Sequence, residues 1–261
     1  MSAPQISPAP RRFLGVSFKM YFDHDETLSW TDEVIGVISH DKSWPSRVDV
    51  VEFPSFPSIP AVVGLANTTG VMVGAQNLAD SDEGPFTGEV SGRTLRQVGC
   101  SYVEVGHAER RLKFCEDDRV IGRKLCRAFQ SGLTPLLCVG EPRDGSSGTA
   151  GRYCVAQVSA ALAAMPDTVD APSLVVAYEP VWAIGAAAPA TEEHTRAVCD
   201  MVRTWLSAHR PDMSVRVVYG GSAGPGLYTR LAADVDGLFL GRFAHDPMAF
   251  LEILGEVAAV C

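Results

Sequence analysis

The chain has 261 residues, of which 46% are hydrophobic and 20% are charged, and its formal net charge is −9. This composition predicts a folded protein with a large core and excludes a disordered chain. The acidic balance, with no basic stripe, excludes a general nucleic-acid surface or an anionic-membrane surface, so any bound anion needs a local site.

The chain opens with "MSAPQISPAP", which is rich in proline and small residues and lacks the apolar stretch of a signal peptide. We expect residues 1–10 to form a flexible tail and residues 11–261 to form one domain. No apolar run approaches the ~20 residues that a membrane-spanning helix needs. The seven cysteines contain no CxxC pair, which indicates reduced thiols in a cytoplasmic protein rather than a disulfide framework or a zinc site.

Eight short runs rich in valine and leucine follow the tail, with little strict alternation of apolar and polar residues. This pattern is typical of parallel strands that are buried on both faces. The predicted strands are residues 13–19, 48–53, 71–75, 102–106, 133–139, 174–178, 215–219 and 236–240.

Helical patterns lie between these runs, most clearly at residues 25–40, 117–132, 191–209 and 246–260. Thr191 is expected to cap the third of them, with Glu192 and Glu193 in the first turn. Asp246 is expected to cap the fourth, with Pro247 at the first helical position.

Eight repeats of strand then helix predict an α/β protein with a single (β/α)₈ barrel. A doubly wound open sheet is the structural alternative. No GxGxxG follows the first strand, which argues against the nucleotide-binding version of that sheet.

Polar residues follow the ends of most predicted strands, where barrels of this kind place their chemistry. Each has an ordinary explanation: a lysine that points into water, a solvated loop glutamate, a histidine that caps a helix, or a tight Gly-Gly turn. Their coincidence on one rim favours a functional site. In chain order they are Lys19, Gln76, Asn77, His107, Glu141, Glu179, Gly220, Gly221, Ser222, Gly241 and Arg242.

These groups have a definite common chemistry. A glutamate can take a proton from a carbon next to a carbonyl group, while lysine and histidine stabilise the enediolate oxygen that develops. Glycine-rich loops after the seventh and eighth strands offer backbone N–H groups to a phosphate. Residues 180–191, "PVWAIGAAAPAT", suit a lid with stiff hinges. A plain connection is the alternative, but this segment exceeds the usual two to six residues.

Seven motifs now stand in order along the chain: "FKM" at 18–20, "GAQN" at 74–77, "FTGEVS" at 86–91, "EVGHAERR" at 104–111, "LCVGE" at 137–141, "YEPVWAIG" at 178–185 and "YGGS" at 219–222. With these motifs the chain resembles the triosephosphate isomerase family over almost its whole length after the tail. The resemblance implies that Glu179 is the general base and His107 a neutral electrophile at a helix start. It also implies that Lys19 is the stabilising cation and Glu109 a charged residue buried beside the site.

The resemblance further implies a small phosphorylated sugar as substrate and a homodimer formed through the loop that carries Thr87. It implies no metal and no organic cofactor. Residues expected to bind substrate or phosphate are Ser17, Gly185, Gly220, Gly221, Ser222, Gly241 and Arg242.

The chain departs from the family pattern around the pocket. Ser17 stands where the family has asparagine, Ala108 where it has serine, and Arg242 where it has the second glycine of a pair. In the lid, Ala187 replaces a glycine, and residues 188–189 replace lysine-threonine. The catalytic groups are kept while the pocket lining changes, which favours the same proton transfer on a different substrate.

The smaller Ser17 side chain leaves room for an extra hydroxymethyl group beside the substrate carbonyl. Adding that group to dihydroxyacetone phosphate gives L-erythrulose 1-phosphate, which a 2,3-enediol would convert to D-erythrulose 4-phosphate. The changes resemble those of family members that act in erythritol and threitol breakdown. Arg242 would grip the phosphate or the added hydroxyl, or else point outward as a surface arginine. An ordinary triosephosphate isomerase with neutral changes and a non-catalytic sugar-phosphate-binding barrel are the alternatives.

Overall fold

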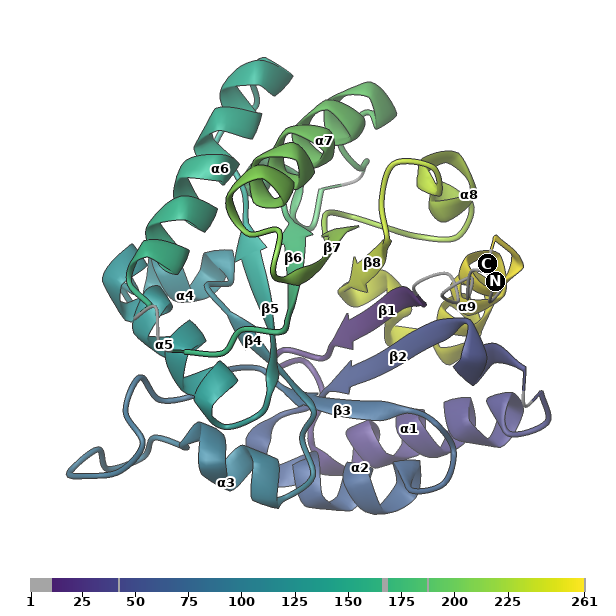
Figure 1. The fold of residues 1–261 in the computed structure, drawn as a ribbon. Coiled ribbons are helices and arrows are strands. Elements are labelled where there is room, and N and C mark those ends of the chain that lie inside the picture. Colours follow the sequence, from purple (N-terminus) through teal and green to yellow (C-terminus); the bar gives the residue numbers. More distant parts are fainter. Residues whose placement is uncertain (1–10, 42, 166–168, 187, 261) are drawn as a thin grey trace, which may run out of the picture.

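Eight parallel strands close into a barrel in which each strand pairs with its neighbours in chain order. The structure, a computed structural model, describes residues 11–41, 43–165, 169–186 and 188–260. The barrel closes where β1 pairs with β8, with Phe13 opposite Gly237. Figure 1 shows the helices arranged around the outside of the strands. The predicted (β/α)₈ barrel is confirmed.

The strand boundaries lie close to those predicted from the apolar runs. The strands are β1 (Arg12–Ser17), β2 (Val48–Phe53), β3 (Met72–Ala75), β4 (Tyr102–Val105), β5 (Thr134–Val139), β6 (Ser173–Tyr178), β7 (Ser214–Tyr219) and β8 (Gly237–Leu240). The first strand ends at Ser17, so Lys19 belongs to the following loop and not to the strand.

The α-helices of the described residues are α1 (His24–Ile38), α2 (Ile59–Ala66), α3 (Gly92–Gln97), α4 (Ala108–Lys113), α5 (Asp118–Gln130), α6 (Ser147–Ala163), α7 (Glu192–His209), α8 (Leu227–Leu231) and α9 (Pro247–Ala259). Single 3₁₀ turns are η1 (Trp44–Ser46), η2 (Phe56–Ser58), η3 (Val181–Ala183) and η4 (Arg242–His245). Two predicted caps are confirmed, because the side chain of Thr191 accepts from the His194 N–H and that of Asp246 accepts from the Met248 N–H. Each cap satisfies a backbone donor that the helix itself leaves unpaired.

Two apolar layers hold the barrel together. One fills the barrel interior, where the rings of Phe53 and Phe239 meet edge to face with centroids 5.5 Å apart. A Cβ on Gly74 would lie 2.3 Å from the Phe53 ring, so only glycine fits there. The other layer packs the outer strand faces against the helices. The tightly filled interior makes a rigid base for the loops at the C-terminal ends of the strands.

The loop between β3 and α3 projects from the barrel on the left of Figure 1. Phe86, in the predicted "FTGEVS" loop, is 45% exposed. No helix within the described parts of the chain is long and apolar enough to cross a membrane. Residues 1–10, expected to form a tail, and Ala187 of the predicted lid lie outside the described residues.

Candidate active site

A cavity of about 540 Å³ opens at the C-terminal ends of the strands. It brings together every residue that the sequence places in the site, while the roles given to those residues remain predictions. Those residues are Ser17, Lys19, His107, Glu109, Glu179, Gly185, Gly220, Gly221, Ser222, Gly241 and Arg242. Three other residues expected on the rim, Gln76, Asn77 and Glu141, are absent from the cavity lining.

Glu179 follows β6 directly and is 4% exposed. Its N–H donates to the carbonyl of Val139 at 2.8 Å, which continues the pairing of β6 with β5 by one residue. A Cβ on residue 220 would lie 2.7 Å from the Glu179 Cγ, so Gly220 makes room for the carboxylate. Glu179 Oε2 has no hydrogen-bond partner among the described residues. A buried carboxylate with one unpaired oxygen in a cavity is suited to accept a proton.

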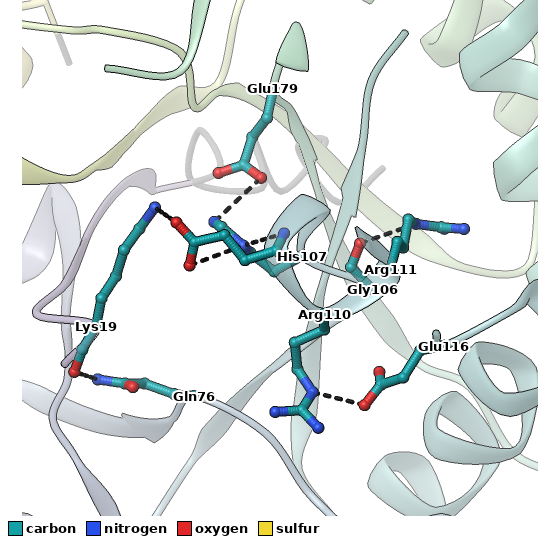
Figure 2. Close-up of polar contacts among 9 residues, drawn as sticks. Lys19, Gln76, Gly106, His107, Arg110, Arg111, Glu116 and Glu179 are labelled. Atoms are coloured by element: carbon teal, nitrogen blue, oxygen red, sulfur yellow. Dashed lines mark hydrogen bonds and ion pairs between the residues drawn. The ribbon is translucent and has the colours of Figure 1, made fainter. Parts of the chain in front are cut away.

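His107 caps the N-terminus of α4, and its Nδ1 accepts the Glu109 backbone N–H at 3.1 Å. A ring nitrogen that accepts a hydrogen bond carries no proton, so the imidazole is neutral and its proton is on Nε2. Nε2 lies 3.6 Å from Glu179 Oε2. Figure 2 shows Lys19, His107 and Glu179 turned toward one another. The histidine therefore presents an N–H donor to the same space that the glutamate faces.

Lys19 has a left-handed backbone with φ of 52°, which is uncommon for a residue with a side chain. Two side chains hold its carbonyl group: Gln76 Nε2 donates at 2.9 Å and Ser55 Oγ donates at 3.2 Å (Figure 2 shows the Gln76 contact). These contacts come from the residue that follows β3 and from the loop after β2, so the barrel rim imposes the conformation. The sequence alone carried no signal of it.

The ammonium group of Lys19 pairs with Glu109, with Nζ 2.8 Å from Oε1. Burial lowers the pKa of Lys19, but the hydrogen bond to Glu109 and the charges of Glu179 and Glu109 outweigh it, so the pKa is raised. Burial raises the pKa of Glu109, but the Lys19 hydrogen bond outweighs it, and the pKa is lowered. Both groups stay charged at neutral pH, which leaves a cation fixed at the cavity wall.

Much of the remaining cavity lining consists of small residues, among them Gly185, Gly220, Gly221, Ser222 and Gly241. Gly185 has φ of 71°, and the N–H groups of Gly185 and Ser222 have no acceptor among the described residues. The Gly220 N–H, in contrast, donates to the Tyr178 carbonyl at 2.8 Å. Gly220 therefore makes space for the Glu179 side chain, but its backbone N–H is already paired and is not available to a phosphate. Arg242 is exposed at the cavity mouth, where its Nη2 donates to the Gly185 carbonyl at 3.3 Å.

The predicted lid, residues 180–191, is anchored at both ends. Glu141 accepts from Trp182 Nε1 at 2.7 Å and from the Tyr178 hydroxyl at 3.1 Å. At the other end, the Ala190 N–H donates to the Tyr219 hydroxyl at 3.0 Å. Glu141 thus supports the lid from behind and does not face the cavity.

Asn77 is also turned away from the cavity. Its Oδ1 accepts from Lys124 Nζ at 2.6 Å, and Lys124 also pairs with Glu116 at 2.6 Å. These contacts join the loop after β3 to Lys124 in α5 and to Glu116 in the segment between α4 and α5. The sequence placed Asn77 at the right strand end but could not show which way its side chain points.

The comparisons with known proteins agree with this geometry. The family model described as triosephosphate isomerase matches residues 12–257. The chain belongs to the triosephosphate isomerase family. It is therefore an isomerase, and the predicted resemblance is confirmed.

Several relatives carry one of two names. An L-erythrulose-1-phosphate isomerase of Pectobacterium atrosepticum is 46% identical over 93% of this chain and 94% of its own length. One of Mesorhizobium japonicum is 36% identical over 95% of this chain and 97% of its own. A triosephosphate isomerase of Aquifex aeolicus is 33% identical over 94% and 98%.

Two of the departures expected from the family resemblance, Ser17 and Arg242, line the cavity. Ser17 is 1% exposed and lies in the cavity wall beside Lys19. Arg242 lies at the mouth beside Gly185. Ala108 is the first residue of α4, next to His107. Ser17 and Arg242 therefore share a cavity with the residues that the resemblance makes catalytic.

One buried acidic residue of the "EVGHAERR" motif was not predicted to belong to the site. Glu104, in the middle of β4, is 3% exposed. An acidic residue inside a strand that is otherwise apolar is the signal that marks it.

Proposed function

We propose that this isomerase converts L-erythrulose 1-phosphate to D-erythrulose 4-phosphate without a cofactor, by proton transfer through an enediolate. The observation that carries the proposal is the place of Ser17, a small side chain in the cavity wall beside Lys19. The names of the relatives from Pectobacterium and Mesorhizobium support the same four-carbon substrate.

The proton transfer follows from three groups. Glu179 removes the proton from C3, and the electrons of that C–H bond form the C2–C3 double bond. The C2 oxygen gains negative charge, which the Nε2–H of His107 and the ammonium group of Lys19 stabilise. The C3 hydroxyl proton moves to the C2 oxygen, a proton returns to C2, and the C3 oxygen becomes the new carbonyl. Atoms and charge balance without any oxidant, because the carbonyl moves by one carbon within the same molecule.

The phosphate is assigned to the side of the cavity opposite His107. The backbone N–H groups of Gly185 and Ser222 support this assignment, because neither has an acceptor among the described residues. Gly221, Gly241 and Arg242 line the same cavity. Oriented N–H groups and a guanidinium group both favour a dianion.

Triosephosphate isomerase activity is the second candidate. Its support is the relative of that name from Aquifex, together with the presence of Lys19, His107 and Glu179 in one cavity. The deciding experiment follows proton exchange in D₂O and measures kcat/KM with L-erythrulose 1-phosphate and with dihydroxyacetone phosphate side by side. If dihydroxyacetone phosphate reacts near the diffusion ceiling of about 10⁸–10⁹ M⁻¹s⁻¹ and the tetrulose phosphate does not react, the second candidate replaces the first.

The proposal includes a homodimer formed through the loop that carries Thr87. Phe86 in this loop is 45% exposed, and Met20, next to Lys19, is 94% exposed. Leu112 and Phe114 are 69% and 62% exposed, and exposed large apolar side chains are typical of an interface. Sedimentation equilibrium of the wild type and of Phe86→Asp tests this. A wild-type monomer would contradict the proposal.

We assign the protein to the cytoplasm. All the cysteines of the described residues are free: Cys100, Cys115, Cys126, Cys138, Cys154 and Cys199. Free thiols are the usual state in a reducing compartment. Fractionation of cells that produce the protein would test this assignment.

A further inference from the structure

Two buried polar side chains lie close to each other, one in the lining of the cavity and the other beneath it. Ser17 is the last residue of β1 and Glu104 lies in β4; they are 1% and 3% exposed. Side chains of a strand alternate between its faces, so Glu104 shares a face with Tyr102, which packs in the barrel interior. Glu104 therefore points into the barrel, beneath the groups that line the cavity.

Neither of these side chains is fully paired. Ser17 Oγ and Glu104 Oε1 both lack a hydrogen-bond partner among the described residues. Ser17 lines the cavity directly. Its hydroxyl is near enough to Glu104 to lower the pKa of that carboxyl, although the two do not form an aligned hydrogen bond. Buried polar atoms without partners are costly, so a ligand hydroxyl that reached Ser17 Oγ from the cavity would gain a hydrogen bond.

The surroundings keep Glu104 uncharged at neutral pH. The pKa of Glu104 is raised to about 8, mainly by burial. The charges of Glu179 and Glu109 also raise this pKa, while the Ser17 hydroxyl and the charge of Lys19 lower it. The thiol of Cys138 also faces Glu104 and Glu179, and burial raises the pKa of that thiol well above its usual value. A protonated carboxyl both donates and accepts a hydrogen bond, as does the Ser17 hydroxyl.

We propose that Ser17 and Glu104 form a polar subsite for the hydroxyl group at C4 of the substrate, and that Glu104 is a specificity-determining residue. The inference rests on the proposed four-carbon substrate and names the groups that select it. A triose phosphate lacks this hydroxyl and leaves both side chains unpaired. Hydrogen-bonding sites discriminate strongly against ligands that lack the expected group.

The protein contains a matched buried acid for comparison. Glu52 in β2 is fully buried, and burial raises its pKa to about 7. Thr31 of α1 donates to Glu52 Oε2 at 2.8 Å, so this carboxyl lies between the barrel and a helix and does not line the cavity. Glu52→Gln and Glu52→Val repeat the chemical changes made at Glu104 without touching the subsite.

The test measures the ratio of kcat/KM for L-erythrulose 1-phosphate to that for dihydroxyacetone phosphate. We expect Glu104→Val to lower the ratio by about 10- to 100-fold, and Glu104→Gln, which keeps a donor and an acceptor, to restore it to within about threefold of wild type. The Glu52 variants should leave the ratio unchanged. If Glu104→Val does not fold, Ser17→Ala replaces it and should lower the ratio by about tenfold.

The outcomes separate the two proposals. If the wild type does not react with the tetrulose phosphate, the proposed function fails and this inference fails with it. If the wild type reacts and Glu104→Val lowers kcat/KM for both substrates equally, Glu104 is a structural acid. The inference is then overturned while the proposed function stands.

Discussion

Oε2 of Glu179 lies 3.6 Å from Nε2 of His107. One residue comes from the end of β6 and the other from the start of α4, so the barrel alone brings them together. A carboxylate that can accept a proton and an imidazole N–H that can donate a hydrogen bond therefore lie together in the cavity. This pairing is what a carbonyl shift between adjacent carbons needs.

Glu179→Gln is expected to lower kcat by about 10²- to 10⁴-fold, because an amide cannot accept the proton that the carboxylate removes. KM should change much less, since the amide fills the same space. The matched control is Glu193→Gln, an exposed glutamate of α7, which should react as the wild type does. Proton exchange in D₂O gives both rates. A loss of less than tenfold for Glu179→Gln would show that another group is the base.

Ser17→Asn is expected to shift the preference toward the three-carbon substrate. The larger amide fills the space that we assign to the hydroxymethyl group, so kcat/KM for L-erythrulose 1-phosphate should fall by about tenfold or more relative to that for dihydroxyacetone phosphate. Ser29→Asn, on the exposed side of α1, is the control for the substitution itself. Equal losses with both substrates would argue against a role of this position in substrate choice.

The barrel was predictable because its strands are short apolar runs with clear ends. Val48–Phe53 agrees with the prediction residue for residue, and Pro54 marks its end. Helix caps such as Thr191 were equally visible, since one side chain decides them. Most of the cavity residues followed from strand ends, because parallel strands bring their carboxyl ends to one rim. Ser17, Glu109 and Gly185 came only from the family resemblance.

The orientations of single side chains were not predictable in this way. Asn77 follows a strand like its neighbours but turns to Lys124, and this choice depends on a partner distant in the sequence. Lys19 adopts a left-handed backbone because Gln76 and Ser55 hold its carbonyl. Glu104 was readable as an acid within a strand, but its nearness to Ser17 depends on how the barrel closes.

Arg242→Leu is expected to raise KM for either sugar phosphate by about tenfold and to change kcat by less than about threefold. The guanidinium group lies at the cavity mouth and bonds to the Gly185 carbonyl, so it is placed to attract the phosphate rather than to act on the carbon skeleton. Added salt should reduce the difference in KM between the wild type and Arg242→Leu, because salt screens an exposed charge. Arg196→Leu, an exposed arginine that pairs with Asp234, is the control. A variant with unchanged KM would mean that Arg242 points away from the substrate.

Glu104→Gln is expected to change the alkaline side of the pH profile. Because the pKa of Glu104 is raised to about 8, its carboxyl loses its proton above that pH and places a second anion beside Glu179. The wild-type kcat/KM for the tetrulose phosphate should therefore fall above about pH 8, while Glu104→Gln should keep its value. The pKa values of Lys19 and Cys138 are both raised, so these groups titrate later. Identical profiles for the two proteins would assign the decline to another group.

Glu52→Gln is expected to remove a loss of stability that the wild type undergoes as the pH rises. Burial raises the pKa of Glu52 from 4.5 to about 7, so the folded state binds this proton more tightly than the unfolded state. The contribution of this proton to the free energy of unfolding is full below about pH 4.5 and is lost as the pH rises through about 7. The free energy of unfolding falls by at most ~1.4 kcal/mol per pH unit in this range. Between about pH 5 and pH 8 the variant should gain on the order of 2–3 kcal/mol in unfolding free energy relative to wild type.

Urea unfolding at both pH values, at one protein concentration, measures this difference. The glutamine can still accept the Thr31 hydroxyl that donates to Glu52 Oε2 at 2.8 Å, so the variant keeps that contact while losing the titrating group. Glu193→Gln serves again as the control, because its side chain is exposed in both proteins. If the stability difference between Glu52→Gln and wild type is the same at both pH values, the carboxyl does not titrate in this range. The cost of burying it would then be independent of its proton.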